Sequence, residues 1–258
     1  MVQSSSSKHP PPQWAAGELT NPHLSAEKAS KVKGMFSAIA ESYDLNNRLH
    51  SLWRDQAWRR LAVRRAAVQP GDHILDVACG TGDLTQAFAA TGAQRVIGVD
   101  FTPRMLDVAR TKQRGLTREQ ATKITYVEGD AQSLDFADAS FNVVSIAFGI
   151  RNVTSPLSAL SEFHRVLKPG GRLVILEFDR PLFPPLRWMN DFYCGWVMPK
   201  TATLISGDTS GAYKYLPASV GSFMPRKALA QAIAEVGFKD VEDRGLTLGI
   251  CVCYSARK

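Results

Sequence analysis

Apolar positions in the middle of the chain switch repeatedly between the period of a strand and the period of a helix. Short apolar runs are separated by segments whose apolar residues recur every three or four positions. The expected strands are His73–Val77, Arg95–Asp100, Ile124–Glu128, Phe141–Ala147 and Arg172–Phe178, and the expected helices between them are Leu84–Thr91, Arg104–Lys112 and Leu157–Leu167. Strands that alternate with helices form a mostly parallel sheet. The pattern therefore predicts an α/β fold of the Rossmann-like kind.

Three segments depart from this alternation. Residues 1–25 combine a serine run with three consecutive prolines, a composition that buries little apolar surface, and we expect a disordered tail there. Residues 26–68 have helical periodicity and predict a helical N-terminal cap. Residues 181–225 are rich in Trp, Phe, Tyr, Met and Pro, and we expect an inserted lid over the carboxyl edge of the sheet. The chain then returns to a helix at Arg226–Val236 and to strands at Val241–Leu246 and Gly249–Ala256.

Composition narrows the class of protein. A chain of 258 residues, 45% of them hydrophobic, can bury one sizeable core, so we expect residues 26–258 to form a single domain. The four cysteines are too few and too irregularly spaced for a disulfide framework or a metal site. No run of 18 apolar residues spans a bilayer and the N-terminus lacks an apolar signal segment, so we expect a cytoplasmic protein. The net charge of +7 favours an acidic partner without choosing among nucleic acid, a phosphorylated substrate and an anionic membrane surface.

A glycine-rich loop follows the first expected strand, where open α/β sheets bind ligands. Gly80 and Gly82 let the backbone approach a ligand closely. A dinucleotide site would have a third glycine at the position of Thr85, and its pyrophosphate would need an electropositive helix start, whereas Asp83 adds negative charge there. The acidic Asp76 before the glycines instead suits a ligand that carries an ammonium and a sulfonium group.

Two further carboxylates end neighbouring strands. Asp100 ends the second strand, about twenty residues beyond the glycines, where a carboxylate accepts hydrogen bonds from ribose hydroxyls. Asp130 follows the third strand, where it can accept a hydrogen bond from an adenine amino group. Turn residues alone would explain any one of these positions, but three acidic strand ends in register predict an S-adenosyl-L-methionine site.

The constellation resembles class I S-adenosylmethionine-dependent methyltransferases, and the fuller pattern is similar to the C-methyltransferase family of menaquinone and ubiquinone biosynthesis. The resemblance covers about Lys33 to Lys258. It rests on Tyr43-Asp44-Leu45-Asn46-Asn47, Trp58, Gly80-Thr81-Gly82-Asp83-Leu84-Thr85, Phe148-Gly149-Ile150-Arg151-Asn152-Val153, Arg165-Val166-Leu167-Lys168-Pro169-Gly170-Gly171, Leu176-Glu177-Phe178, and Tyr213-Lys214-Tyr215-Leu216 with Ser219.

The resemblance implies a seven-stranded, mostly parallel sheet with an antiparallel last strand. It also implies that Thr81, Asp100, Asp130 and Ala131 contact the methyl donor. With the strand-end argument, the predicted cofactor residues are Asp76, Gly80, Thr81, Gly82, Asp100, Asp130 and Ala131. The chain departs from the family pattern at four positions: Asn46 replaces a common methionine, Asp55 a usual histidine, Ala147 a serine and Asp179 a serine.

The implied reaction methylates a ring carbon of a prenylated quinol. Such a carbon is nucleophilic only as the hydroxyl ionises, and a free phenol has a pKa of about 10. We expect Arg151 to stabilise the phenolate and Asn152 to orient it, with a helix-capping or sheet-edge ion pair as the alternative role for these two residues. Asp44 is the expected proton acceptor and Tyr43 the residue that orients the ring, although helix capping and core packing explain these two almost as well. The sequence does not favour His50 as a proton carrier.

Trp188, Phe192 and Trp196 recur at four-residue spacing within the insertion and predict an aromatic helix stripe. Packing on the core explains most such stripes; the alternative is an entrance for an isoprenoid chain at a membrane surface, with peripheral contact at its inner face. The rival functions are a methyltransferase for another acceptor and a donor-binding subunit without activity. Phe148-Gly149-Ile150-Arg151 differs from the run typical of base-amino methyltransferases, so no nucleic-acid partner is expected. The sequence leaves the oligomeric state open.

Overall fold

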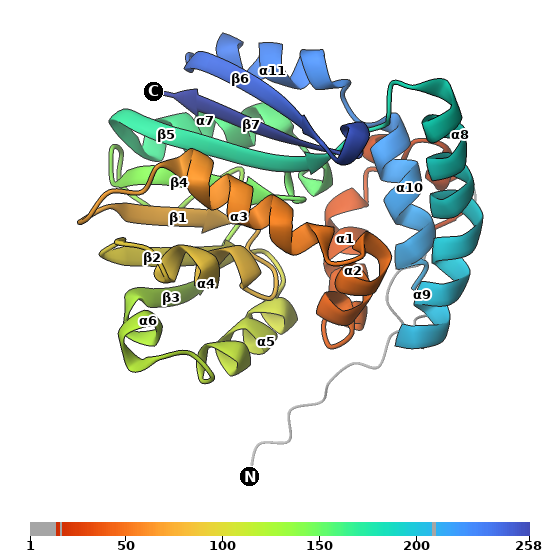
Figure 1. Cartoon of the computed structure of the whole chain (residues 1–258), viewed down its shortest axis with the longest axis horizontal. Coiled ribbons are helices and arrows are strands. Elements are labelled where there is room, and N and C mark those ends of the chain that lie inside the picture. Colours follow the sequence, from red (N-terminus) through yellow and green to blue (C-terminus); the bar gives the residue numbers. More distant parts are fainter. Residues whose placement is uncertain (1–13, 16, 208–209) are drawn as a thin grey trace.

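A seven-stranded sheet forms the centre of the protein. The computed structural model describes residues 14, 15, 17–207 and 210–258, and its strands follow the order β3-β2-β1-β4-β5-β7-β6 (Figure 1). The strands are β1 (His73–Val77), β2 (Arg95–Asp100), β3 (Ile124–Glu128), β4 (Phe141–Ala147), β5 (Leu167–Phe178), β6 (Lys239–Leu246) and β7 (Cys251–Arg257). β1 to β5 pair in parallel, and β7 is antiparallel to both of its neighbours. The predicted fold class and the antiparallel last strand are confirmed.

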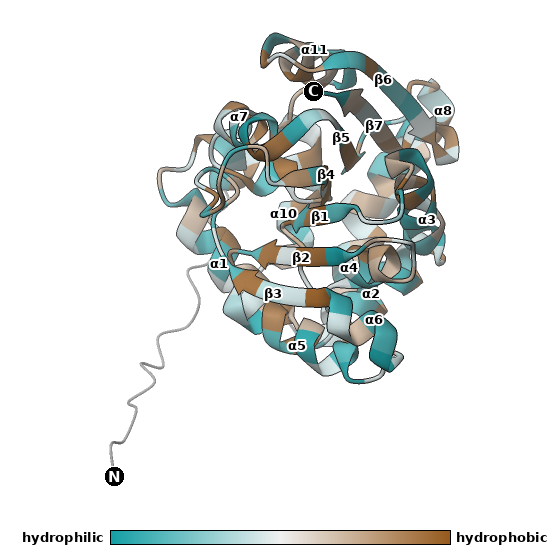
Figure 2. Cartoon of the chain, turned by 90° about the vertical axis from the view of Figure 1, so that its left-hand side faces the viewer, coloured by the Kyte–Doolittle hydropathy of each residue, from teal (hydrophilic) through white to brown (hydrophobic). Residues whose placement is uncertain are grey.

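Helices cover both faces of the sheet because successive strand residues point to opposite sides. On β1, Ile74 packs with the helices α3 (Arg54–Ala66) and α4 (Asp83–Ala89), while Leu75 packs with α7 (Pro156–Val166) and α11 (Arg226–Glu235). The helices that complete these layers are α4 (Asp83–Ala89), α5 (Pro103–Gln113), α6 (Arg118–Lys123), α7 (Pro156–Val166) and α11 (Arg226–Glu235). Figure 2 shows hydrophobic residues concentrated in central strands such as β4 and β7, whereas the edge strand β6 is largely hydrophilic.

The start of β5 differs from its prediction. The Pro169-Gly170-Gly171 turn predicted a strand beginning only at Arg172, but β5 begins at Leu167. Leu167 pairs with Phe141, and the register shifts before the regular pairing of Arg172 with Val143 begins. A bulge in the ladder therefore accommodates the turn, a feature that only the neighbouring strand determines.

The predicted N-terminal cap divides into α1 (Lys28–Ile39), α2 (Tyr43–Ser51) and α3 (Arg54–Ala66). Leu52 and Trp53 have left-handed backbone angles, with φ of 51° and 59°, and these end α2 and redirect the chain into α3. α3 lies on the sheet, whereas α1 and α2 lie beyond the carboxyl ends of the parallel strands (Figure 1). The cap therefore covers the edge at which ligands bind to such sheets.

The prediction of a disordered tail through residue 25 is wrong for its described part, and residues 1–13 lie outside the described residues. Residues 17–25 contain two short 3₁₀ helices, η1 (Glu18–Thr20) and η2 (Pro22–Leu24). Trp14 is buried and stacks on Tyr215 with ring centroids 4.7 Å apart. The composition of this segment did not indicate order because another part of the chain supplies the apolar surface that it covers.

The aromatic-rich insertion is helical. It contains α8 (Pro184–Phe192), a π-helical turn η4 (Tyr193–Val197), α9 (Met198–Ser206) and α10 (Ala212–Ser222). Figure 1 shows these helices beside α1 and α2 beyond the carboxyl edge of the sheet, as expected for a lid. None of the helices in the described part of the chain is both long and apolar enough to cross a membrane.

Candidate active site

The loop after β1 turns sharply because it contains two glycines with left-handed backbone angles. Gly80 has φ of 55° and Gly82 has φ of 84°. A β-carbon on Gly80 would meet no atom within 4 Å, whereas a β-carbon on Gly82 would collide with the hydroxyl of Tyr126. Gly80 lines a cavity and Gly82 does not. Gly80 thus opens the backbone to a ligand, while Gly82 admits the side chain of Tyr126 and does not line this cavity.

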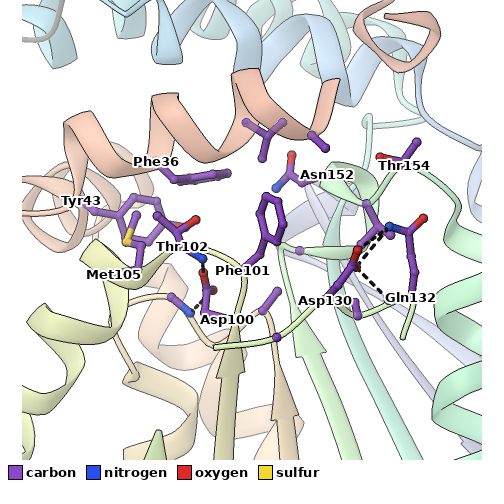
Figure 3. A pocket seen from close by; sticks show the side chains of 18 residues that line it. Phe36, Tyr43, Asp100, Phe101, Thr102, Met105, Asp130, Gln132, Asn152 and Thr154 are labelled. Atoms are coloured by element: carbon purple, nitrogen blue, oxygen red, sulfur yellow. Dashed lines mark hydrogen bonds between the residues drawn. The ribbon is translucent and has the colours of Figure 1, made fainter. Parts of the chain in front are cut away.

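A cavity of about 100 Å³ lies between this loop, the ends of β2 and β3, and the cap helices (Figure 3). Asp100 lies at its base, and its carboxylate accepts hydrogen bonds from the backbone N–H groups of Gly80 and Thr102, both at 2.8 Å. Burial raises the pKa of Asp100 above its usual value. Asp130 lies across the cavity, where its Oδ1 accepts the backbone N–H of Gln132 at 2.9 Å. Figure 3 shows Phe36 and Tyr43 closing the cavity from the helices.

The residues around this cavity fit a sulfonium nucleoside. A carboxylate has about four lone-pair positions, so Asp100 can still accept from ribose hydroxyls while it holds the loop. Asp130 keeps acceptor capacity for an adenine amino group, and the phenyl ring of Phe101 supplies an apolar surface at the same edge. The volume is below the roughly 300–1,000 Å³ of ligand pockets, so this conformation is too closed to hold a whole nucleoside.

Asp76 does not line the cavity, contrary to its predicted contact with the donor. Its carboxylate is buried and accepts hydrogen bonds from Thr85 Oγ1 at 2.6 Å and from Ser145 Oγ at 2.7 Å. Thr85 therefore replaces the third glycine of a dinucleotide loop with a hydroxyl that ties the following helix to β1. Burial raises the pKa of Asp76 to about 6.

Asp76→Asn is expected to make the protein more stable than the wild type above pH 6 and similar to it near pH 4. The unfolded carboxyl has a pKa of 3.8 and the folded one about 6, so the stability that this raised pKa provides is present below pH 3.8 and lost as the pH rises through 6. Above pH 6, the free energy of unfolding of Asp76→Asn is therefore expected to exceed that of the wild type by about 3 kcal/mol. Urea unfolding between pH 4 and 7.5 measures it, with the exposed Asp135→Asn as control. Parallel pH curves for wild type and Asp76→Asn would contradict the assignment.

Asp44 and Thr81 clamp the cap onto the glycine loop. Thr81 Oγ1 donates to Asp44 Oδ1 at 2.5 Å, and Lys112 bridges Asp44 and Asp83 with both distances at 2.5 Å. Arg48 of the same helix pairs with Asp83 at 2.8 Å. Neither Asp44 nor Thr81 lines a cavity. Both oxygens of Asp44 are therefore engaged in holding α2 closed, which does not favour Asp44 as the proton acceptor.

Arg151 forms an ion pair, the alternative to a contact with substrate, and this pair is buried. Its side chain is 5% exposed, and Nη1 donates to Glu177 Oε1 at 2.6 Å and to the carbonyl of Phe148 at 2.7 Å. Asn152 Nδ2 donates to the same carbonyl at 3.1 Å. Phe148 has a left-handed backbone with φ of 59°, a strained conformation that persists where surrounding contacts hold it. Arg151 and Asn152 supply those contacts.

A second cavity of about 640 Å³ adjoins the first, and Tyr43 lines both. Its walls come from α2, α3, the end of β5, η4 and α10, and Trp58, Phe148 and Phe178 provide an aromatic side. The rings of Phe148 and Phe178 lie 4.6 Å apart. Asn152 faces the first cavity, where Tyr215 Oη donates to its Oδ1 at 2.9 Å and fixes the amide.

Two residues of the larger cavity, His50 and Tyr193, are not among the site residues predicted from the sequence. His50 lies two helical turns after Tyr43, and this seven-residue spacing places both on one face of a helix. The spacing was a usable signal. Tyr193 belongs to the insertion, and nothing local to its sequence connects it to α2.

Residues 24–258 match the model of the ubiE/COQ5 methyltransferase family. The chain belongs to this family. It is 40% identical over 235 residues to the ubiquinone/menaquinone biosynthesis C-methyltransferase UbiE of Geobacter sp. (strain M21), covering 90% of this chain and 98% of the relative. It is also 40% identical to the demethylmenaquinone methyltransferase of Clavibacter sepedonicus, covering 90% and 92%. The fold matches an S-adenosylmethionine-dependent methyltransferase from Thermotoga maritima with a TM-score of 0.60, at 19% identity and over 88% of this chain and 99% of that one.

In this ubiE/COQ5 family member, the smaller cavity brings together about half of the predicted site. The predicted residues that line it are Tyr43, Gly80, Asp100, Asp130, Ala131 and Asn152. Those that lie behind it are Asp44, Asp76, Thr81, Gly82 and Arg151. The residues behind the cavity all hold the loop, the cap or the strained turn through contacts made elsewhere.

Proposed function

We propose that this chain transfers the methyl group of S-adenosyl-L-methionine to a ring carbon of a prenylated quinol in quinone biosynthesis. The observation that carries the proposal is the shared wall at Tyr43 between the small cavity that Asp100 and Asp130 line and a large, mostly apolar cavity. The names of the Geobacter and Clavibacter relatives, which concern ubiquinone and menaquinone, support this acceptor class. The donor supplies an electrophilic methyl group on a positively charged sulfur.

In this proposal the chain's own residues bind and orient. Asp100 accepts hydrogen bonds from the ribose and Asp130 from the adenine, while Gly80 admits the nucleoside to the backbone. Tyr43 and Asn152 orient the acceptor ring at the boundary between the cavities. Arg151, which reaches neither cavity, acts as a positioning residue because it holds the turn that places Phe148 against the acceptor. The closed cap excludes water from the reacting groups.

Methyl transfer from labelled donor to demethylated quinols tests this function. Demethylnaphthoquinol and the benzoquinol equivalent, each with a short prenyl chain, are compared with an RNA pool and with no acceptor. Label in the quinol fraction supports the proposal and distinguishes the two ring types. Label only in RNA, or donor binding without transfer to any acceptor, would contradict it.

We further propose that the insertion contacts a membrane surface, where the prenyl chain of the substrate resides. Trp188 and Trp196 are 73% and 59% exposed and form a stacked row with Phe192. The same segment contributes Tyr193 and Cys194 to the larger cavity. One side of the insertion thus presents aromatic rings to the surroundings, and the other side faces the cavity. This arrangement allows a lipid chain to pass from a membrane surface into the cavity.

Replacing both Trp188 and Trp196 with serine is expected to lower the partitioning of the protein onto vesicles about tenfold or more. A large apolar side chain contributes about 1.5–3 kcal/mol when fully buried and less when it enters only an interface. Flotation with neutral and with anionic vesicles measures the effect. Leu157→Ser, at a residue 49% exposed on α7, is the matched control. Equal flotation of the double variant and the control would contradict membrane contact through this segment.

A further inference from the structure

The larger cavity contains two buried polar atoms without a hydrogen-bond partner among the residues that the structure describes. They are Oδ1 of Asn46 and Nε2 of His50. Both residues line the cavity and belong to α2, four positions apart, so they neighbour each other on one face of the helix. A buried polar atom without a partner costs about 1–3 kcal/mol. Two such atoms at the wall of one cavity indicate a ligand that supplies the missing partners.

The neighbours of these side chains determine which kind of partner is missing. Asn46 Nδ2 donates to the carbonyl of Ser42 at 3.2 Å, so the free atom of this amide is its acceptor oxygen. His50 Nδ1 lies 3.0 Å from the hydroxyl of Tyr193, and that hydroxyl also lies 3.5 Å from the carbonyl of His50. The tautomer of His50 that satisfies both contacts is the one in which the Tyr193 hydroxyl donates to the carbonyl and accepts from Nδ1–H, and we assign this tautomer. Nε2 is then left with a free lone pair.

We propose that Asn46 and His50 recognise the hydroxyl groups of the reduced acceptor, and that Nε2 of His50 takes the proton of one of them. The proposal rests on the proposed quinol methylation and assigns the residue that ionises the ring. Two acceptors match a quinol, which carries O–H donors, and they reject the oxidised quinone, whose oxygens only accept. The site therefore reads the redox state of the ring as well as its shape.

The proton balance is simple. The quinol O–H bond breaks, its electron pair stays on oxygen and the proton forms the N–H bond of an imidazolium at His50. Replacing a ring C–H by C–CH₃ releases that ring proton, and the imidazolium returns its own proton to the oxygen. One proton is therefore released per turnover and His50 ends neutral. Burial lowers the pKa of His50 below its usual value, so the ring starts neutral at pH 7 and is able to accept.

The other charged groups around this cavity are arginines, which have no acceptor atom, and carboxylates, of which Asp55 and Asp191 are held in ion pairs. They are Arg54, Asp55, Arg59, Asp179, Arg180 and Asp191. Asp55 accepts from Arg59 at 3.0 Å and from Arg48 at 3.3 Å, and Asp191 pairs with Arg180 at 2.6 Å. Asp179 Oδ1 accepts the backbone N–H of Arg180 at 2.8 Å. Both Asn46 Oδ1 and His50 Nε2 are covered in this structure, so the proposed contact requires a side-chain rotation of the kind common on ligand binding.

Binding measurements test the recognition of hydroxyl groups separately from turnover. A demethylnaphthoquinol with a short prenyl chain and its quinone are titrated anaerobically into wild type, Asn46→Leu and His50→Gln. We expect wild type to prefer the quinol, and each variant to lose roughly three- to tenfold in quinol affinity while quinone affinity stays unchanged. Equal affinity of wild type for quinol and quinone would overturn the proposal, and so would unchanged quinol affinity in both variants.

The pH profile of single-turnover methyl transfer tests the proton transfer. In wild type the rate is expected to rise with pH through a pKa below 6.5, because only neutral His50 accepts a proton. His50→Gln is expected to lose this limb and about a hundredfold in rate, while affinity for the demethylated donor stays at the wild-type value. His73→Gln, at a partly buried histidine at the start of β1 that lines neither cavity, is the matched control.

Tyr193→Phe removes the partner of Nδ1 and leaves the imidazole in place. It is expected to reduce the rate less than His50→Gln and to shift the pKa of the acid limb rather than abolish it. If wild type methylates a quinol and His50→Gln keeps the wild-type rate and acid limb, the role of His50 is wrong and the proposed function stands. If wild type binds the donor but methylates no quinol, both fail.

Discussion

Asp100→Asn is expected to weaken binding of S-adenosylmethionine and of its demethylated product about a hundredfold. The carboxylate accepts the N–H groups of Gly80 and Thr102 and retains lone pairs for two ribose hydroxyls. In asparagine, an NH₂ group that donates hydrogen bonds replaces one of the two acceptor oxygens. This group then faces either a backbone N–H or a ribose hydroxyl from which the carboxylate oxygen accepted a hydrogen bond. Hydrogen bonds to a charged group contribute about 1.5–3 kcal/mol, and a hundredfold change corresponds to about 2.7 kcal/mol.

Calorimetric titration with the demethylated product measures this loss, and thermal unfolding without ligand shows whether the loop itself is disturbed. Asp135→Asn removes an equal charge from an exposed position outside both cavities and is expected to bind normally. Asp130→Asn is expected to weaken binding of the demethylated product less than Asp100→Asn does. The side chain of Asp130 accepts hydrogen bonds from the neighbouring Gln132 and fixes no part of the glycine loop. If Asp100→Asn binds the demethylated product with wild-type affinity, the assignment of the cofactor site to this cavity is wrong.

Glu177→Gln is expected to lower the free energy of unfolding by about 3–5 kcal/mol, which is about 10 °C or more in Tm for a chain of this size. Glu177 is 2% exposed and pairs with Arg151 at 2.6 Å. Removing its charge leaves a buried guanidinium without its counter-ion, and the desolvation cost of that cation is then uncompensated. Chemical unfolding at pH 7 measures the change.

The same pair separates two roles for Arg151. If Arg151 acts as a positioning residue, Glu177→Gln and Arg151→Lys both loosen the turn at Phe148, and both raise the KM for the quinol more than they lower kcat. The measurements are made at a temperature where each variant remains folded. If Arg151 stabilises the phenolate directly, Arg151→Lys lowers kcat alone and Glu177→Gln leaves kcat near the wild-type value. The second pattern would restore the substrate contact expected from the sequence motif.

Part of the site could be predicted from sequence because its geometry is local. Gly80, Asp100 and Asp130 follow the ends of three parallel strands, and parallel strands end at the same edge of a sheet. Their convergence required only the order of elements along the chain. Tyr43 and Asn152 were located by their motifs, and both line the cavity.

The residues whose roles differ from prediction depend on distant partners. Asp44 is held by Lys112, 68 positions away, and Arg151 by Glu177, 26 positions away. A motif reports which residue is present but not whether its charge is already paired. His50 is the opposite case, because the role that we propose for it rests on an Nε2 without a partner among the described residues and on Tyr193, which lies 143 positions away.

The order of strands and helices, the glycine loop and the acidic strand ends were determined by the sequence alone, because hydrophobic period and backbone freedom act over a few residues. The tertiary structure decided which carboxylates line the smaller cavity, where the cap divides, and which polar atoms at the larger cavity have no partner among the described residues. Those outcomes depend on side-chain direction and on the free energy of burying charge, and both are defined only when segments far apart in the chain come into contact.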